Sequence, residues 1–390
     1  MKKRLKNIII KLLMILQPKT RENFLNMKKI LKRKSIKEKE QKIEYIFKDY
    51  KCSKEEIDIR DLKGWKEKLK KYVLYSNDGI EFSNKFLNTK ICLINKAKIK
   101  ESKRLPIVIC VVKNDLIRMK LFLNYYRKVG IKHFAILDDK STDGTRQYLE
   151  EQEDVDLFES NEGYTTLIRQ IWINRILEYY GTGRWYLILD SDELFTYRNM
   201  ENYNIMSLIE KLEEKGINRM QTILLDMYSE DAIFSDIPDT PEIVEKKYSY
   251  YDANNIYKLN NIKFNCLAGG VRCRIFSEKN NEFKPYLTKY PLIKYEKEDI
   301  VCNSHYAFPF YKNFEADCIG VLRHYKFLSG DMKKYRERAE KGNFEQGSIQ
   351  YKKYIELYKK DKKFSFKNEN SKHWINSLSI DDIKIVKDWR

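Results

Sequence analysis

Three carboxylates stand within four positions of one another in the segment RWYLILDSDELF, residues 184–195. The apolar and aromatic run before them is typical of a buried strand, and Asp190, Asp192 and Glu193 follow it at once. Two carboxylates that alternate around one residue in a turn suit Mg²⁺ or Mn²⁺, which complete their coordination with water and substrate phosphates. Such a charged pair is costly beside a core without a compensating cation. The alternative interpretation is an Asp-rich turn that caps a helix.

A second polar cluster, DDKSTDGT at 138–145, follows another strand-like run, HFAIL at 133–137. The later residues of this cluster have the composition of a turn that begins a helix. A turn does not explain Asp138 and Asp139, which stand directly at the end of the run. We expect these two carboxylates to accept hydrogen bonds from a nucleobase or a ribose.

The elements that must position these clusters alternate between strands and helices. Apolar runs predict strands at 107–112, 133–137, 185–189 and 220–227, and periodic segments predict helices at 116–130, 146–152, 165–180 and 205–216. Such alternation indicates an α/β fold with a mostly parallel sheet and crossover helices. Ligands bind beyond the carboxyl ends of the strands in such sheets. The clusters at 113–115, 138–145 and 190–193 should therefore converge on one edge.

The segment GGVRCRIF at 269–276 carries two arginines spaced two apart. On a strand, Arg272 and Arg274 share a face, and the preceding glycines permit a close approach of the backbone. Arginine binds phosphate through two parallel hydrogen bonds, so the two arginines are a candidate phosphate-binding site. An exposed basic strand is the alternative.

Several motifs together resemble one enzyme family. The chain is similar to nucleotide-sugar glycosyltransferases of the family 2 type, and most resembles the bacterial subgroup related to the family 92 transferases. The resemblance covers about residues 105–358, and residues 1–70 show none that is comparable. It rests on VVKND, LFLNYYRKVGIKHFAILDDKSTDGT, WYLILDSDELF, LLDMYS, GGVRCRIF, KYPLIKY, NSHYAFP, LRHYKFLS and EKGNFEQGSIQYKKYIE, in that order.

The resemblance implies a GT-A, Rossmann-like fold: a mostly parallel sheet with flanking helices. It also implies that Asp190 and Asp192 hold Mn²⁺ or Mg²⁺ on a diphosphate. Asp138 and Asp139 would contact a uridine-type nucleoside, with Asn114 nearby.

A histidine from the C-terminal half supplies a further metal ligand in many enzymes with this fold. His305 and His324 are the candidates, and we expect at least one of them to be a hydrogen-bonded core residue instead. The resemblance implies inversion at the anomeric carbon, which needs one carboxylate base. Asp226 is our first choice for that base and Glu193 the second; Asp226 could equally be a turn or capping residue.

The implied reaction moves a sugar from a UDP-type donor to a hydroxyl of a glycan or lipid-linked acceptor. Two other enzymes that use a DxD motif stay open. In a phosphatase of the haloacid dehalogenase type the first Asp is the nucleophile, but Thr or Val usually follows the motif, where this chain has Glu193. A sugar nucleotidyltransferase normally carries a Gly-rich loop after its first strand, and ICVVKND has no glycine.

The positive charge of the chain is concentrated at its N-terminus. Residues 1–42 hold 15 Lys or Arg against three Glu, so they contribute +12 of the net +19. The apolar run at 7–16 is interrupted by Lys11 and is too short to span a membrane. Association of this arm with an anionic membrane surface is one interpretation, and a helix packed on the body is the other. No nucleic-acid-binding motif is present, so we expect no nucleic acid as a partner.

The organisation of the chain follows from these patterns. We expect a basic arm with a helical and mixed extension at 1–100, a GT-A domain at 101–330 and a helical C-terminal extension at 331–390. The chain has seven Cys and no CxxC spacing, which is typical of a reduced cytoplasmic protein. The arm would then allow peripheral association with the inner face of the membrane.

Overall fold

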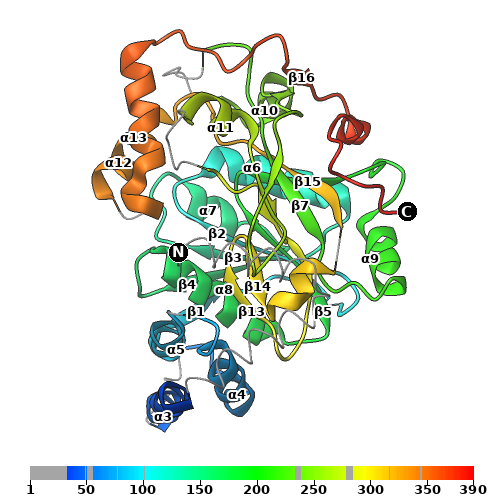
Figure 1. Ribbon diagram of the computed structural model, residues 1–390. Coiled ribbons are helices and arrows are strands. Elements are labelled where there is room, and N and C mark those ends of the chain that lie inside the picture. The colour runs from blue at the N-terminus through cyan, green and yellow to red at the C-terminus, as the bar shows by residue number, and fades with distance from the viewer. Residues whose placement is uncertain are drawn as a thin grey trace, which may run out of the picture.

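The computed structural model describes residues 33–48, 50, 56–76, 78–100, 102–232, 239–277, 284–315, 317–342 and 345–390. Its centre is a six-stranded sheet (Figure 1). The strands, in spatial order, are β1 (Ile91–Asn95), β4 (Val155–Ser160), β3 (Phe134–Asp138), β2 (Ile107–Val112), β5 (Arg184–Asp190) and β12 (Leu292–Tyr295). The four inner strands run parallel, and the two edge strands run antiparallel to their neighbours. The predicted α/β fold with a mostly parallel sheet is therefore confirmed.

A second sheet of four strands adjoins the first. Its order is β11 (Thr288–Lys289), β7 (Gln221–Asp226), β15 (Cys318–His324) and β6 (Glu193–Tyr197). The strand predicted at 220–227 exists as β7, but it belongs to this sheet. Strand β15 runs parallel to β7 and antiparallel to β6, so the end of β15 lies between the end of β7 and the start of β6.

The four predicted helices are present and flank the sheet. They are α6 (Leu116–Val129), α7 (Thr145–Glu150), α8 (Thr166–Tyr180) and α9 (Ile205–Glu214). Helix α6 ends at Gly130, whose φ of 100° is a left-handed conformation that glycine adopts without strain. Helix α8 begins after Thr165, whose side chain accepts a hydrogen bond from the backbone N–H of Ile168.

Further elements surround this body. Before it come α3 (Arg33–Lys48), α4 (Leu62–Tyr72) and α5 (Gly79–Asn88). After it come α12 (Met332–Lys341) and α13 (Glu345–Lys360), which pack on each other (Figure 1). The shorter elements are α10 (Pro241–Lys247), β8 (Tyr250–Tyr251), β9 (Tyr257–Leu259), β10 (Cys266–Ala268), α11 (Gly270–Phe276), β13 (Ile300–Asn303), β14 (Tyr306–Phe308), η1 (Phe310–Phe314), β16 (Lys372–His373) and η2 (Ser377–Asp382).

The central sheet separates two apolar layers. Successive residues of β2 point to opposite faces, as a strand requires. Val108 and Cys110 pack in one cluster with α6, and Ile107 and Ile109 pack in another with Trp172 of α8. Because both faces are buried, the register of β2 is fixed and the residues that follow it hold a defined position.

Most of the basic arm lies outside the described residues: 1–32 are not described, and 33–42 belong to α3. Within the described ranges, no helix is both long and apolar enough to cross a membrane. Association of the arm with an anionic surface stays a prediction. The division at residues 100 and 330 likewise stays a prediction.

Candidate active site

Side-chain contacts join the three polar clusters at one edge of the central sheet. After β2, the side-chain oxygen of Asn114 accepts a hydrogen bond of 2.7 Å from the backbone N–H of Thr142, in the cluster after β3. Asp115 accepts a hydrogen bond of 2.5 Å from the Ser191 hydroxyl, in the turn after β5. The clusters after β2, β3 and β5 therefore meet, as their positions after parallel strands predict.

A chain of three polar side chains crosses from this edge into the second sheet. The Nε2 atom of His324 lies 3.2 Å from a carboxylate oxygen of Asp192, and its Nδ1 atom lies 2.6 Å from one of Asp226. Burial lowers the pKa of His324, but the two carboxylates raise it by more. Burial raises the pKa of Asp192, and its contact with His324 lowers that pKa well below the usual range.

Asp192, Glu193 and His324 form a possible metal site. Each offers one ligand atom, and these atoms all lie within 4.8 Å of one another. Carboxylate oxygens and an imidazole nitrogen are both common ligands of divalent cations. The donor set therefore fits a divalent cation.

The second candidate histidine lies outside that cluster. His305 stands in the turn between β13 and β14, and its Nδ1 atom lies 2.8 Å from the backbone carbonyl oxygen of Thr288. Burial and the positive charge of Lys289 lower the pKa of His305 to about 4. His305 is a hydrogen-bonded neutral side chain, as we expected for at least one of the two histidines.

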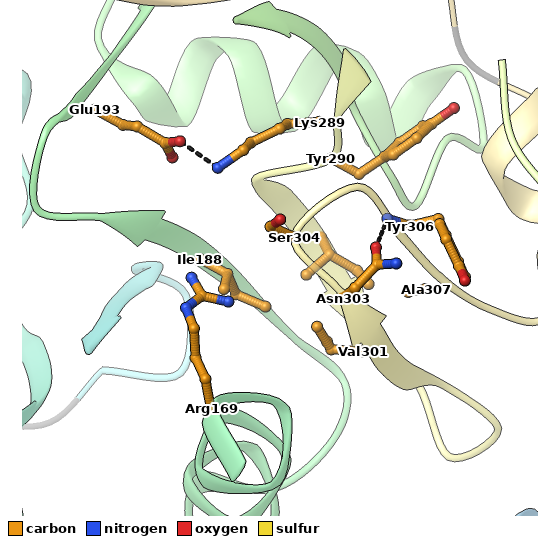
Figure 2. A pocket seen from close by; sticks show the side chains of 11 residues that line it. Arg169, Ile188, Glu193, Lys289, Tyr290, Val301, Asn303, Ser304, Tyr306 and Ala307 are labelled. Carbon is orange, nitrogen blue, oxygen red and sulfur yellow. Dashed lines mark hydrogen bonds and ion pairs between the residues drawn. The ribbon is translucent and has the colours of Figure 1, made fainter. Parts of the chain in front are cut away.

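Asp190 faces two cations, not the Asp192–His324 pair. Its carboxylate forms ion pairs with Arg169, in the first turn of α8, and with Lys289 at 2.8 Å. Lys289 also pairs with Glu193, and Figure 2 shows this contact beside the pocket that these residues line. Burial raises the pKa of Asp190, and the two cations lower it by more. Lys289 stands in the motif KYPLIKY, but no pattern in the sequence marks Arg169.

Glu193 is almost completely buried within the site. Burial, together with the negative charges of Asp190 and Asp192, raises the pKa of Glu193 to about 7. The positive charge of Lys289 lowers this pKa, but by less. One oxygen accepts a hydrogen bond of 3.2 Å from the backbone N–H of Asp190. Glu193 lines the pocket shown in Figure 2, together with Ser304 and Tyr306.

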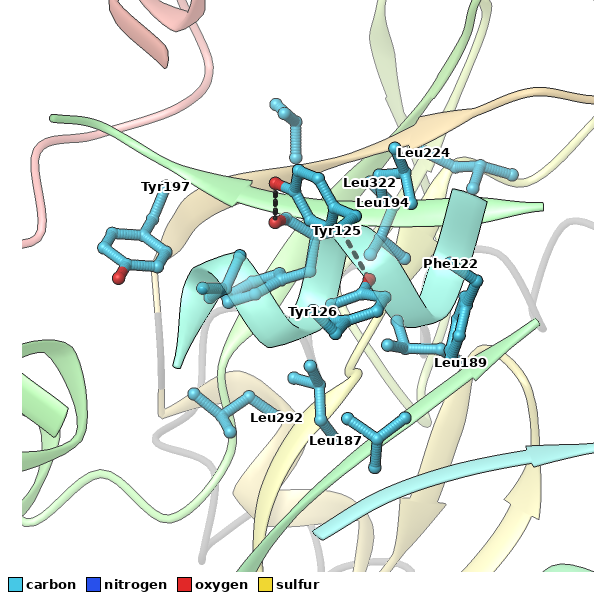
Figure 3. Packing of buried hydrophobic residues seen from close by; sticks show 14 of the residues in the cluster. Phe122, Tyr125, Tyr126, Leu187, Leu189, Leu194, Tyr197, Leu224, Leu292 and Leu322 are labelled. Carbon is cyan, nitrogen blue, oxygen red and sulfur yellow. Dashed lines mark hydrogen bonds between the residues drawn. The ribbon is translucent and has the colours of Figure 1, made fainter. Parts of the chain in front are cut away.

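Aromatic side chains of α6 hold the strand on which Glu193 stands. The Tyr126 hydroxyl donates to the backbone carbonyl of Glu193 at 2.9 Å and accepts from the backbone N–H of Phe195 at 2.7 Å. The neighbouring Tyr125 hydroxyl donates to the carbonyl of Phe195. Figure 3 shows both tyrosines among the leucines that pack between helix and strands. These contacts fix the start of β6, and with it the Glu193 side chain.

The predicted nucleoside-binding carboxylates are both buried. One oxygen of Asp138 accepts a hydrogen bond from the backbone N–H of Ser141, and the other has no hydrogen-bond partner among the described residues. Asp139 forms an ion pair of 2.9 Å with Lys113, whose own side chain is about half exposed. Asn114, in the neighbouring cluster, has a positive φ of 49°.

The expectation that Arg272 and Arg274 share one face of a strand is wrong. They lie on the short helix α11, where residues two apart point in different directions. Arg272 pairs with Asp226 at 2.7 Å, and Arg274 pairs with Asp252 at 2.8 Å. The consecutive glycines before them have φ of 134° and 71°, left-handed conformations that begin this helix and cannot continue a strand.

Asp226, our first choice for a base, is held on both sides. One carboxylate oxygen contacts Arg272 and the other contacts His324. Burial raises the pKa of Asp226, and Arg272 and His324 lower it by more. A carboxylate with a depressed pKa is a weak base, so the structure favours Asp226 as the group that orients His324.

Comparisons with known proteins do not identify the chain. No family model matches its sequence, and no curated protein matches it. The solved structures that match include the crystal structure of 4-diphosphocytidyl-2C-methyl-D-erythritol synthase, with 9% sequence identity and a TM-score of 0.28. That match covers 50% of this chain and 76% of the other. At this level of similarity it carries no argument about activity.

Proposed function

We propose that this protein is a metal-dependent glycosyltransferase that moves a sugar from a UDP-type donor to a hydroxyl of a glycan or lipid-linked acceptor. The observation that carries the proposal is the chain of contacts from Asp192 through His324 to Asp226, next to the Asp115–Ser191 contact. It stands at the carboxyl edge of a parallel sheet, where such folds bind nucleotides. The motif resemblance points to the same reaction.

In this proposal Asp192 and His324 hold Mn²⁺ or Mg²⁺, and Glu193, the third member of that cluster, serves as the base and not as a ligand. When bound, the cation supplies Lewis-acid stabilisation of the departing diphosphate. Asp226 accepts the hydrogen bond of the His324 Nδ1–H, and this contact turns Nε2 toward Asp192. Asp190 contributes through its ion pairs with Arg169 and Lys289, which fix the turn that carries Asp192.

We propose Glu193 as the base, ahead of Asp226. The acceptor hydroxyl transfers its proton to Glu193 as its oxygen bonds to the anomeric carbon, and the bond from that carbon to the diphosphate oxygen breaks. Two observations support Glu193: it lines the pocket of Figure 2, and its pKa of about 7 suits proton transfer near neutral pH. Asp226 has neither property.

The rate of transfer is expected to rise with pH through about 7. Because a base must be ionised to accept a proton, activity is lost as the pH falls below the raised pKa of Glu193, which is about 7. We expect kcat/KM to fall tenfold per pH unit on the acid side. A profile from pH 5.5 to 8.5 checks this expectation. In Glu193→Gln the acid limb should disappear, and the remaining rate should be lower by about 10²–10⁴-fold. A wild-type profile that stays flat down to pH 5.5 would contradict the role of Glu193.

Binding of nucleotides by the wild-type protein tests the proposed function. We expect calorimetry to detect binding of UDP in the presence of Mn²⁺, and much weaker binding when the metal is chelated. Asp138, Asp139 and Asn114 would contact the nucleoside, so uridine alone should also bind, weakly. A sugar nucleotidyltransferase should prefer the nucleoside triphosphate, and a phosphatase should show no preference for a nucleoside. Absence of any nucleotide binding by the folded protein would refute the proposal.

The phosphatase interpretation of the DxD motif has less support. It requires Asp190 to attack a phosphorus atom as a nucleophile. The carboxylate of Asp190 is instead engaged by Arg169 and Lys289, and its pKa is lowered, which weakens it as a nucleophile.

A further inference from the structure

A donor diphosphate needs cations besides a metal, and the two arginines expected from the sequence are engaged elsewhere. Arg272 pairs with the buried Asp226, and Arg274 pairs with Asp252 and with the carbonyl of Phe366. Releasing either arginine would leave a buried or partly buried carboxylate without its partner, which is costly. Other cations must therefore bind the diphosphate beside the turn at residues 190–192, and they have to come from another part of the fold.

Helix α12 is anchored directly against that turn. The buried Arg118 of α6 pairs with Asp331, the residue before α12, and with Asp115 at 3.0 Å. Arg118 also donates to the backbone carbonyls of Tyr325 and Lys326. The backbone N–H of Tyr325 in turn donates to the carbonyl of Asp192 at 2.7 Å. These contacts hold the start of α12 and the segment before it beside Asp115 and Asp192.

Two lysines belong to this anchored region. The Nζ atom of Lys334, on α12, lies 3.0 Å from the oxygen of Asp115 that Ser191 does not use. Asp115 keeps Arg118 and Ser191 as partners when Lys334 turns to a phosphate, so it is not left uncompensated. Lys326 follows Tyr325, whose backbone N–H donates to the carbonyl of Asp192, so Lys326 stands beside the turn that carries Asp192. Among the described residues, Lys326 has no carboxylate within ion-pair distance.

The phenol of Tyr351, on α13, indicates how positive this surface is. Arg338 donates to its hydroxyl at 2.8 Å, and the Nζ atom of Lys326 lies 5.3 Å from its ring centroid. Burial raises the pKa of Tyr351, yet Lys326 and Arg338 lower it by more, so the net shift is downward. Arg338 and Lys326 thus bring two positive charges to this side of the site, and such a surrounding stabilises a bound polyanion.

We propose that Lys326 and Lys334 bind the diphosphate of a nucleoside-diphosphate donor, so that the C-terminal helical pair α12–α13 forms one wall of the donor site. The inference rests on the proposed function and specifies its substrate class. Lysine binds phosphate as a point charge, and these two are half-buried, where such a contact is stronger than on the open surface. A diphosphate carried by a lipid has the same chemistry, so the experiment has to distinguish the two sources.

The test compares UDP, uridine and geranyl diphosphate by calorimetry in the presence of Mn²⁺. The double variant Lys326→Gln/Lys334→Gln is expected to bind UDP at least about tenfold more weakly, since one charge-assisted contact corresponds to roughly tenfold in affinity. Its affinity for uridine should stay within about twofold. Lys326→Arg/Lys334→Arg keeps both charges and should retain most of the affinity for UDP. Lys333→Gln/Lys341→Gln removes two exposed charges from the same helix and should bind UDP as the wild type does.

Any of the following results would contradict the inference. Unchanged UDP binding in the glutamine variant would show that these lysines do not touch the diphosphate. An equal loss for uridine would indicate a general distortion of the site. If the glutamine variant loses binding of geranyl diphosphate but not of UDP, the two lysines bind a lipid-linked diphosphate and not the nucleotide donor. If the wild type binds no UDP at all, the proposed function itself fails, which is a different result from failure of the variants alone.

Discussion

Asp192→Ala is expected to lower the rate of sugar transfer, or of donor hydrolysis, by at least about 10³-fold. The change removes the carboxylate that faces His324 across 3.2 Å, and so removes one ligand of the proposed metal site. Loss of several kcal/mol of charge stabilisation in the transition state corresponds to that factor. Binding of UDP should also lose its dependence on Mn²⁺. Enzyme kinetics together with calorimetry, with and without Mn²⁺, measure both effects.

The fold should survive this change, because Asp192 lies in a turn and its side chain is about a quarter exposed. Thermal unfolding should confirm that the variant is folded at the assay temperature. Asp317→Ala is the matched control, since Asp317 is exposed and pairs only with the exposed Lys387 among the described residues. A rate for Asp192→Ala within tenfold of the wild type would count decisively against a metal at this position.

Arg118→Met is expected to lower the free energy of unfolding by about 3–5 kcal/mol. The Arg118 side chain is nearly fully buried and compensates Asp331 and Asp115, so its removal leaves buried negative charge without its main partner. It also removes the donors to the carbonyls of Tyr325 and Lys326. Urea titration followed by circular dichroism measures the change. Because these contacts anchor α12, proteolysis should cleave the variant between β15 and α12 more readily than the wild type.

The control for this prediction is Arg146→Met. Arg146 also pairs with two carboxylates, Glu150 and Glu159, but its side chain is a quarter exposed and theirs are more so. Water and salt screen such pairs, and the expected loss is below about 1 kcal/mol. Equal effects of the two substitutions would mean that burial does not determine what Arg118 contributes.

The sequence alone determined three neighbouring parallel strands of the central sheet and the edge where the site lies, but it did not predict β1, β4 or β12. Apolar runs bounded by turns predicted β2, β3 and β5, and periodic segments predicted α6 and α8. These signals are local, because a buried strand needs continuous apolar residues and a helix that packs on it needs a repeat near 3.6. The order of strand, polar cluster and helix then requires the clusters after parallel strands to converge.

The tertiary structure alone decided which charged groups meet within that edge. Nothing near Asp190 in the sequence indicates Arg169 or Lys289. Arg118 stands three residues after Asp115, but nothing near either residue indicates Asp331 or Lys334. The pairing of β15 between β6 and β7 selects His324 over His305, because it sets the end of β15 opposite Glu193 and Asp226.

The arginines of GGVRCRIF show that a spacing in the sequence can also predict the wrong geometry. Their spacing of two favoured a shared face, but Gly269 and Gly270 turn the backbone into α11, and Arg272 and Arg274 separate to different carboxylates. A spacing has a geometric meaning only once the secondary structure is known. The candidate ligands could be predicted from the sequence because their motifs are local. Ion pairs between residues far apart in sequence depend on how elements pack. The partners of these ligands, and the pKa shifts that the partners cause, therefore became visible only in the folded structure.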